Sequence, residues 1–259
     1  MVFVSSLIFV SLIIIVSSFF LSTHSAQYIG KLWILFILQS LKTLCGIGWS
    51  IKGIENIPNT PFVMAANHQS PWESFFLQTL FLPTSSIMKK EILIIPFFGW
   101  AISRLKPISI NRKLKVESLK KVVEIGGERI REGYAVLVFP EGTRIPVNTR
   151  GQINPGVFAI HKILKIPVLP IKHNSGRYWK NKRFIKEPGK IRVEFHPVIK
   201  NTSILDFVYS VYALKPNSIE SSSSLSSRYN EEPAILSPKP SCGIGLFVII
   251  NDINIAGTR

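Results

Sequence analysis

The sequence has 259 residues, of which 46% are hydrophobic, and it carries a formal net charge of +16 at pH 7. This length allows one well-buried core, and the two cysteines, Cys45 and Cys242, indicate neither a disulfide framework nor a zinc site. Residues 89–200 carry 24 basic and 8 acidic side chains and supply the whole charge imbalance. A segment this basic is expected to bind polyanions, namely nucleic acid, an anionic membrane or phosphate-bearing substrates.

The N-terminal region favours the membrane among these three. Residues 2–21 contain no charged side chain, and about 20 apolar residues at a rise of ~1.5 Å span a hydrocarbon layer of ~30 Å. We therefore predict a transmembrane helix over about residues 2–21. A cleaved signal peptide is the alternative, but no basic residue precedes the apolar stretch, which is also long for a signal peptide.

A second apolar run, residues 32–41, is too short to cross a bilayer and lies between lysines. It predicts an interfacial helix over about residues 30–46, so that residues 1–50 form a membrane anchor. The lysines that follow the predicted span place the rest of the chain on the cytoplasmic side, because cytoplasmic loops are enriched in positive charge. They are Lys31, Lys42 and Lys52.

From residue 51 to residue 200 the chain alternates between strand-like and helix-like patterns, which predicts an α/β domain with helices packed over a sheet. The predicted strands are residues 62–65, 108–110, 135–139, 168–171 and 191–195. The predicted helices are residues 71–81, 93–104, 114–131 and 156–165.

His68 lies where the first of these strands ends, and Glu73 follows it after four residues. A neutral imidazole paired with a carboxylate removes protons from hydroxyl groups near neutral pH. The alternative is structural: Ser70, Pro71 and Glu73 match the capping box of a helix. The two interpretations are compatible. A metal site is not predicted, because His68 and Glu73 would lie on different helix faces and no third ligand is evident.

A second motif follows the most strongly apolar strand and has the sequence Phe-Pro-Glu-Gly-Thr-Arg over residues 139–144. Ligands of open α/β sheets collect at the carboxyl ends of the strands. Gly142 permits close backbone approach, and the planar guanidinium of Arg144 suits bidentate phosphate binding. An ordinary turn with a solvated arginine is the alternative.

Together these motifs resemble the bacterial 1-acyl-glycerol-3-phosphate acyltransferases. The resemblance covers roughly residues 28–200 and rests on ordered blocks, which are more specific than any single one. They are Asn67-His68 with its acidic residue, residues 95–100, residues 110–112, residues 139–144 and residues 166–171. The resemblance implies a mixed sheet flanked by helices, of the glycerol-3-phosphate acyltransferase type. It also implies transfer of a fatty acyl group from acyl-CoA or acyl carrier protein to lysophosphatidic acid, giving phosphatidic acid.

The resemblance also implies roles for individual residues. His68 would be the general base, and Glu73 would hold its other ring nitrogen, although the commoner family residue there is aspartate. Arg112 and Arg144 would bind the acceptor phosphate, and the pocket around it would be shaped by Glu141, Gly142 and Thr143. Neither a cofactor nor a metal ion is implied. For Arg112, a structural role at a strand end is the alternative.

The implied partners are membrane lipids and the acyl donor, and the implied location is the inner membrane with the catalytic domain in the cytoplasm. Two alternatives remain. One is an acyltransferase of the same fold with another acceptor, such as glycerol-3-phosphate or another lyso-lipid. The other is a membrane-tethered nucleic-acid-binding protein, for which no recognised motif is present, so no nucleic-acid partner is predicted.

Residues 201–259 do not continue the family pattern. They are rich in serine and proline and predict low order over about residues 214–240. A replaced C-terminus is one hypothesis for this tail, and it raises the question of whether this copy is active. Acyl-chain length, donor preference and oligomeric state do not follow from the sequence.

Overall fold

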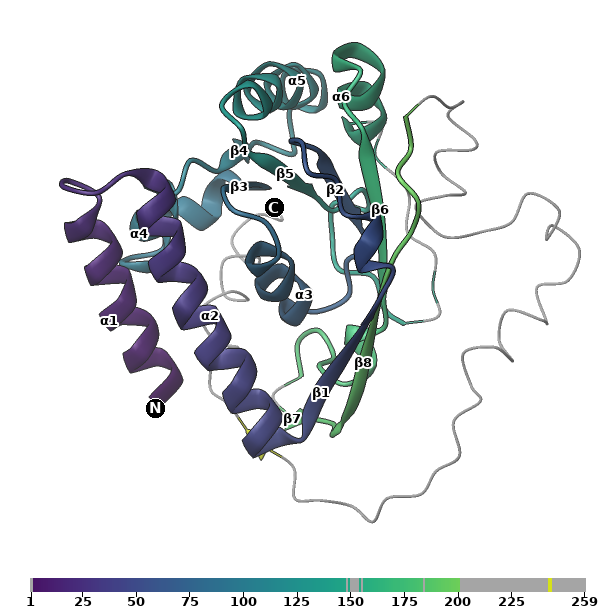
Figure 1. The fold of residues 1–259 in the computed structure, drawn as a ribbon. Coiled ribbons are helices and arrows are strands. Elements are labelled where there is room, and N and C mark those ends of the chain that lie inside the picture. The colour runs from purple at the N-terminus through teal and green to yellow at the C-terminus, as the bar shows by residue number, and fades with distance from the viewer. Residues whose placement is uncertain are drawn as a thin grey trace, which may run out of the picture.

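The computed structural model describes residues 2–147, 149, 154, 156–183, 185–200 and 242–243. Its centre is a seven-stranded sheet with the order β1-β8-β6-β2-β5-β3-β4 (Figure 1). Strands β6, β2, β5, β3 and β4 are parallel, whereas β6 and β8 pair antiparallel. The sheet is therefore mixed, as predicted. Its strands are β1 (Ile47–Lys52), β2 (Val63–Ala66), β3 (Thr84–Lys89), β4 (Ile108–Ile110), β5 (Ala135–Val138), β6 (Val168–His173) and β8 (Gly189–Phe195).

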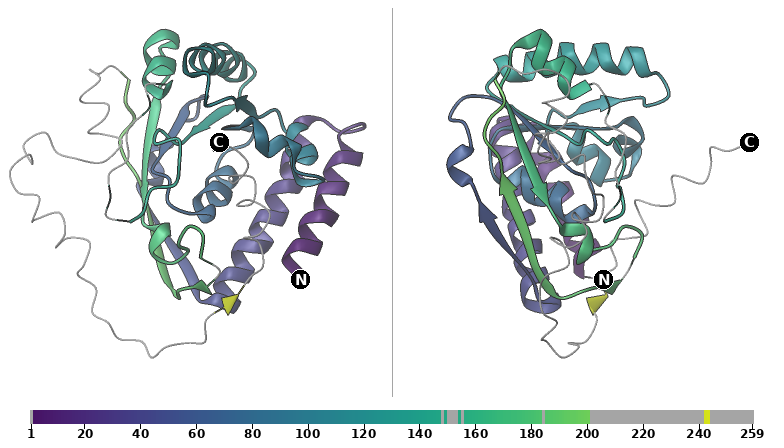
Figure 2. Two further views of the ribbon diagram at one scale, coloured as in Figure 1. Left: turned by 180° about the vertical axis from the view of Figure 1, so that it is seen from behind. Right: turned by 90° about the vertical axis from the view of Figure 1, so that its right-hand side faces the viewer.

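Helices cover both faces of this sheet (Figures 1 and 2). The alternation of side chains along β2 explains why. Val63 and Ala65 pack in one core with α5 and α6, whereas Met64 and Ala66 pack in the other with α2 and α3. The helices are α2 (Thr23–Cys45), α3 (Pro71–Phe76), α4 (Phe98–Ser103), α5 (Lys115–Arg131) and α6 (Gly156–Leu164). Short 3₁₀ segments are η1 (Ile54–Asn56), η2 (Leu77–Thr79), η3 (Lys90–Ile94) and η4 (Ser175–Arg177).

The N-terminal region differs from the prediction in both helices. The first, α1 (Val2–Ser17), has 16 residues, which is only about 24 Å at ~1.5 Å per residue. The second, α2, has 23 residues and is the described helix that is long and apolar enough to cross a membrane. The spanning candidate is thus α2, which contains most of the predicted interfacial helix. The bounds differ because the apolar run of residues 2–21 includes the turn between the two helices.

The boundary predicted at residue 50 falls inside β1, which pairs with β8 along its whole length. One face of α2 also belongs to the core of the sheet, since Ile37, Leu38 and Leu41 are buried against it. The N-terminal region and the α/β region therefore share one hydrophobic core. Cys45, at the end of α2, is disulfide-bonded, and Cys242 in β9 (Cys242–Gly243) is the other cysteine of the chain.

Each predicted strand and helix between residues 51 and 200 is present, with shifted ends. The predicted helix at 71–81 is shorter and ends in 3₁₀ geometry, and the one at 93–104 begins later, at Phe98. Two sheet strands were not predicted, β1 and β3, and neither was the short β7 (Ile185–Lys186). Except for β9, which pairs with β7, the tail lies outside the described residues, so the prediction of low order there stays a prediction.

Candidate active site

The two motifs meet because β2 and β5 are adjacent and parallel, so their carboxyl ends lie at the same edge of the sheet. The loop after β5 binds His68 on three sides. Glu141 Oε2 accepts the backbone N–H of His68 at 2.7 Å, and the backbone N–H of Ile145 donates to the His68 carbonyl at 2.8 Å. The ring of Phe139 stacks on the imidazole, with centroids 4.1 Å apart. His68 is thus fixed in position by a loop some seventy residues away in sequence.

The predicted pairing of His68 with Glu73 is present. Nδ1 of His68 lies 2.9 Å from Oε1 of Glu73, which leaves the opposite ring nitrogen, Nε2, free for a substrate proton. The predicted capping box is also present, with Ser70 as the N-cap and Pro71 in the first turn of α3. Glu73 therefore serves as helix cap and as partner of the histidine at once.

The Glu73 carboxylate is fully buried and surrounded by hydrogen-bond donors. Oε1 accepts the backbone N–H groups of Gln69 and Ser70 at 2.8 and 2.7 Å. Oε2 accepts the hydroxyls of Ser70 and Ser175 at 2.9 and 2.6 Å. A buried carboxylate is stable as an anion only when its lone pairs are satisfied in this way.

Burial and these contacts set the charges of the pair. Burial lowers the pKa of His68 below its ordinary value of 6.5, and the adjacent Glu73 carboxylate only partly offsets this effect. Burial alone would raise the pKa of Glu73, but His173 and the contacts with His68 and Ser175 hold it well below its usual range. At neutral pH the site therefore contains a neutral imidazole beside a carboxylate anion, the arrangement of a general base.

His68 lines a cavity of about 150 Å³ whose wall contains both polar and apolar side chains. The cationic residues Lys89, Arg112 and Arg144 lie in its wall together with His68. The apolar remainder is formed chiefly by Phe75, Ile87, Ile92, Ile95, Phe98 and Ile102. The site therefore offers a base, a group of positive charges and an apolar surface in one space.

Arg144 is the best placed of the cationic residues for an anionic ligand. Its Nη1 donates to Asn181 Oδ1 at 3.4 Å, and its buried Nε has no hydrogen-bond partner within the described structure. A buried guanidinium N–H without a partner is costly, so a ligand oxygen is expected to satisfy it. Arg112 lines the same cavity and is exposed.

The other three predicted phosphate-site residues do not line this cavity. Glu141 is buried and holds the His68 backbone. Gly142 has φ +67°, and an added Cβ would lie 2.8 Å from Asn154 Nδ2, so glycine is needed at this turn. Thr143 is exposed. These residues shape the loop that carries Arg144, and their contact with phosphate stays a prediction.

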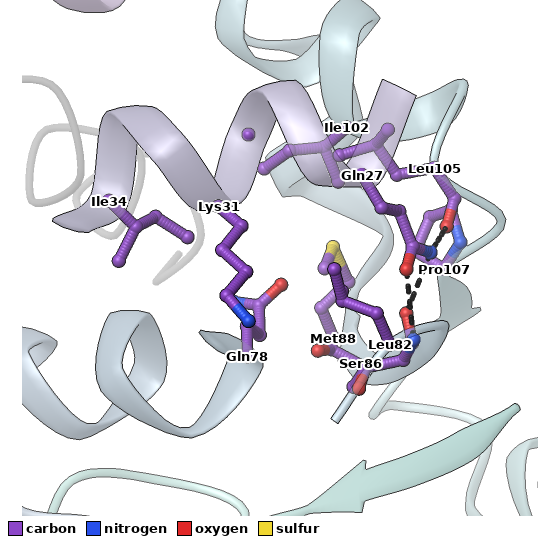
Figure 3. Close-up of a pocket in the computed structure, with 12 residues that line it drawn as sticks. Gln27, Lys31, Ile34, Gln78, Leu82, Ser86, Met88, Ile102, Leu105 and Pro107 are labelled. Atoms are coloured by element: carbon purple, nitrogen blue, oxygen red, sulfur yellow. Dashed lines mark hydrogen bonds between the residues drawn. The ribbon is translucent and has the colours of Figure 1, made fainter. Parts of the chain in front are cut away.

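A second cavity of about 50 Å³ adjoins the first and reaches α2 (Figure 3). Gln78, Ser86, Met88 and Ile102 line both cavities. Gln27, which lines the second cavity, hydrogen-bonds to the Thr84 backbone and donates to the Leu105 carbonyl. Figure 3 shows Lys31 extending from α2 toward Gln78. The space beside His68 therefore continues toward α2 through these shared residues.

The sequence did not predict several residues that support the site. They are Asn67, which hydrogen-bonds to the backbone of His173, and residues of the segment after β6. Ser175 contacts Glu73, Gly176 N–H contacts Gln69 Oε1 at 3.3 Å, and Asn181 contacts Arg144. The sequence signal was the polar run His-Asn-Ser-Gly at the end of a buried strand. Within the described ranges, no group of three or more His, Cys, Asp or Glu side chains is placed to hold a metal ion.

Comparisons with known proteins agree with this geometry. A family model described as Acyltransferase matches residues 49–174. The 1-acyl-sn-glycerol-3-phosphate acyltransferase of Pseudomonas aeruginosa is 42% identical over 173 residues, which cover 67% of each chain. A chloroplastic protein of that name from Brassica napus is 34% identical over 151 residues, covering 56% of this chain and 41% of that one. This chain thus spans less than half the length of the Brassica relative.

A solved structure has the same fold. It is the 1-acyl-sn-glycerophosphate acyltransferase from Thermotoga maritima, which superposes with a TM-score of 0.66 at 23% identity. The match covers 82% of this chain and 88% of that one. The mixed sheet with its flanking helices is therefore an architecture already known from a solved protein.

Proposed function

The chain belongs to the 1-acyl-sn-glycerol-3-phosphate acyltransferase family, and we propose that it transfers a fatty acyl group to the sn-2 hydroxyl of lysophosphatidic acid. The product is phosphatidic acid. The observation that carries this proposal is the cavity that contains His68, Arg112 and Arg144 together with an apolar surface. Its wall combines a base suited to a hydroxyl, cations suited to a phosphate and apolar side chains suited to an acyl chain.

In the proposed reaction, Nε2 of His68 removes the proton of the acceptor hydroxyl while its oxygen attacks the thioester carbonyl of the donor. The tetrahedral adduct collapses, the carbon–sulfur bond breaks, and the departing thiolate takes the proton back from the imidazolium. Glu73, 2.9 Å from Nδ1, stabilises the imidazolium between these steps. General bases of this kind contribute ~10²–10⁴-fold in rate. No acyl-enzyme is formed.

The purified protein tests this proposal directly. It is assayed with acyl-CoA and with acyl carrier protein as donors, and with lysophosphatidic acid, glycerol-3-phosphate or monoacylglycerol as acceptors. The arginines favour a phosphorylated acceptor, and the apolar surface favours one that already carries an acyl chain. We expect lysophosphatidic acid to have the highest kcat/KM. Faster acylation of glycerol-3-phosphate or monoacylglycerol would contradict the proposal.

Arg144→Gln is expected to raise the KM for lysophosphatidic acid by about tenfold or more, because a charge-assisted hydrogen bond is worth about 1.5–3 kcal/mol. The kcat at saturating acceptor should change less, since His68 and Glu73 are untouched. Steady-state kinetics with varied acceptor measure both constants. Arg131→Gln, an exposed change at the end of α5, is the matched control. An unchanged KM in Arg144→Gln would remove Arg144 from the phosphate site.

We also propose that α1 and α2 attach the enzyme to the inner membrane, with the α/β region in the cytoplasm. The turn between them carries Phe19 and Phe20, which are 67% and 84% exposed. Exposed aromatic side chains at such a turn favour a lipid environment. Lys42, in the last turn of α2, and Lys52, in β1, lie at the end of α2 that leads into the α/β region, in keeping with the positive-inside tendency.

Replacing both Phe19 and Phe20 by serine is expected to move a measurable part of the protein from the membrane to the soluble fraction. Each phenylalanine contributes about 1.5–3 kcal/mol when fully buried in an apolar phase. Fractionation after a high-salt wash measures the shift, because salt removes purely electrostatic attachment. Val116→Ser, which removes another exposed apolar side chain, on α5, is the control. Unchanged partitioning of the double variant would contradict the role of the turn.

A further inference from the structure

A second buried histidine lies behind the catalytic pair. His173 is the last residue of β6 and is 4% exposed. The Asn67 side chain accepts the backbone N–H of His173 at 2.9 Å and donates to its carbonyl at 3.0 Å. The ring atom Nε2 of His173 lies 2.6 Å from the carbonyl oxygen of Asn67. Because a carbonyl only accepts hydrogen bonds, Nε2 carries the ring proton. His173 is thereby tied to the peptide that precedes His68.

The other nitrogen of His173 faces Ser175. The Ser175 hydroxyl is 3.0 Å from His173 Nδ1 and 2.6 Å from Glu73 Oε2. An ionised carboxylate only accepts hydrogen bonds, so the Ser175 hydroxyl is the donor in its hydrogen bond to Glu73. The Ser175 backbone N–H then faces Nδ1 at 3.4 Å. A continuous set of contacts therefore runs from Asn67 through His173 and Ser175 to Glu73.

We propose that Ser175 and His173 are positioning residues for the His68 and Glu73 pair, a role that rests on the proposed acyltransferase function. Neither lines the cavity beside His68, so neither touches the substrate there. Ser175 fixes Oε2 of Glu73, which keeps Oε1 directed at Nδ1 of His68. His173 fixes both Ser175 and the Asn67 peptide, so it acts on the carboxylate and on the backbone leading into His68.

The contacts of the two Glu73 oxygens explain why Ser175 matters for the position of this carboxylate. Oε1 of Glu73 is shared by two backbone N–H groups and by His68. Oε2 has two donors, and one of them is the Ser175 hydroxyl. Loss of that donor leaves Oε2 with the Ser70 hydroxyl alone, so the buried carboxylate is less well satisfied and less tightly fixed, which weakens its alignment with the imidazole. Alignment of the base affects the chemical step rather than the binding of lysophosphatidic acid.

Ser175→Ala tests the proposal, with Ser85→Ala as the matched control. Ser85 is also a fully buried serine, and its hydroxyl donates to the Lys106 carbonyl at 2.6 Å, outside the catalytic cavity. We expect Ser175→Ala to lower kcat by about tenfold, the effect of one lost hydrogen bond to a charged group. Its KM for lysophosphatidic acid should stay within about twofold of the wild-type value. Ser85→Ala should keep the wild-type kcat.

A second comparison separates positioning from general destabilisation. His173→Gln keeps an N–H donor for the Asn67 carbonyl but lacks the ring nitrogen that faces Ser175. We expect its kcat to fall as well, and the double variant with Ser175→Ala to lose no more than the larger single loss, because both act through Glu73. If Ser175→Ala does not fold, Ser175→Cys, which keeps the volume and donates weakly, takes its place.

The outcomes distinguish this proposal from the one on which it rests. Wild-type protein that fails to acylate lysophosphatidic acid would overturn the proposed function. An active wild type whose Ser175→Ala variant keeps its kcat, or loses no more than Ser85→Ala, would overturn the positioning role alone. So would a variant that changes only the KM, or a double variant whose losses are additive.

Discussion

The His68→Ala variant is expected not to complement an acyltransferase-deficient bacterium, whereas the wild-type chain restores its growth. The purified variant should lose about 10²–10⁴-fold in kcat, the usual contribution of a general base. The fold should survive, because the backbone contacts of residue 68 with Glu141 and Ile145 remain in the variant. Circular dichroism and expression level in the membrane fraction check that the protein is intact.

The matched control is His24→Ala, which removes an exposed histidine at the start of α2. This variant should rescue growth as the wild type does. Rescue by His68→Ala as well would show that His68 is not the base. Absence of rescue by a well-expressed wild type would count against the function itself, and it would draw attention to residues 201–259.

The local part of the site could be predicted from the sequence. A capping box is fixed by residues three apart, and so the turn from Ser70 to Glu73 is present as predicted. The same turn brings Glu73 back to His68, so the pairing follows from short-range geometry. The strands with continuous apolar side chains, such as β5, were equally clear, because buried parallel strands have this pattern.

The features of the fold and of the site that the sequence did not predict depend on contacts between residues far apart in the chain. β3 begins with Thr84, Ser85 and Ser86, which give no apolar pattern although all three are buried. The Glu141 carboxylate accepts the backbone N–H of His68, a contact across 73 residues that the sequence did not predict. Ser175 likewise reaches Glu73 across 102 residues. Spacing along the chain does not specify such pairs, since they form only when β2, β5 and β6 pair in register.

Glu73→Gln is expected to keep the fold and lose at least about 100-fold in kcat, because an amide does not stabilise the imidazolium as a carboxylate does. Glutamine is nearly isosteric, and its carbonyl still accepts from Gln69 and Ser70 at the Oε1 position. Its NH₂ replaces Oε2, where the Ser70 and Ser175 hydroxyls now donate. Both hydroxyls rotate to accept instead, and that of Ser175 then faces His173 Nδ1, 3.0 Å away.

The pH profile gives this prediction a second readout. The base works when neutral, so activity is lost as pH falls through the pKa of His68. Burial already sets that pKa below 6.5, and the Glu73 carboxylate raises it in part. In Glu73→Gln this opposing effect is gone, so the acid limb of kcat/KM should move to lower pH while the plateau falls. Glu55→Gln, an exposed change in η1, should alter neither. A Glu73→Gln enzyme with the wild-type plateau and acid limb would mean that Glu73 serves α3 only as a cap.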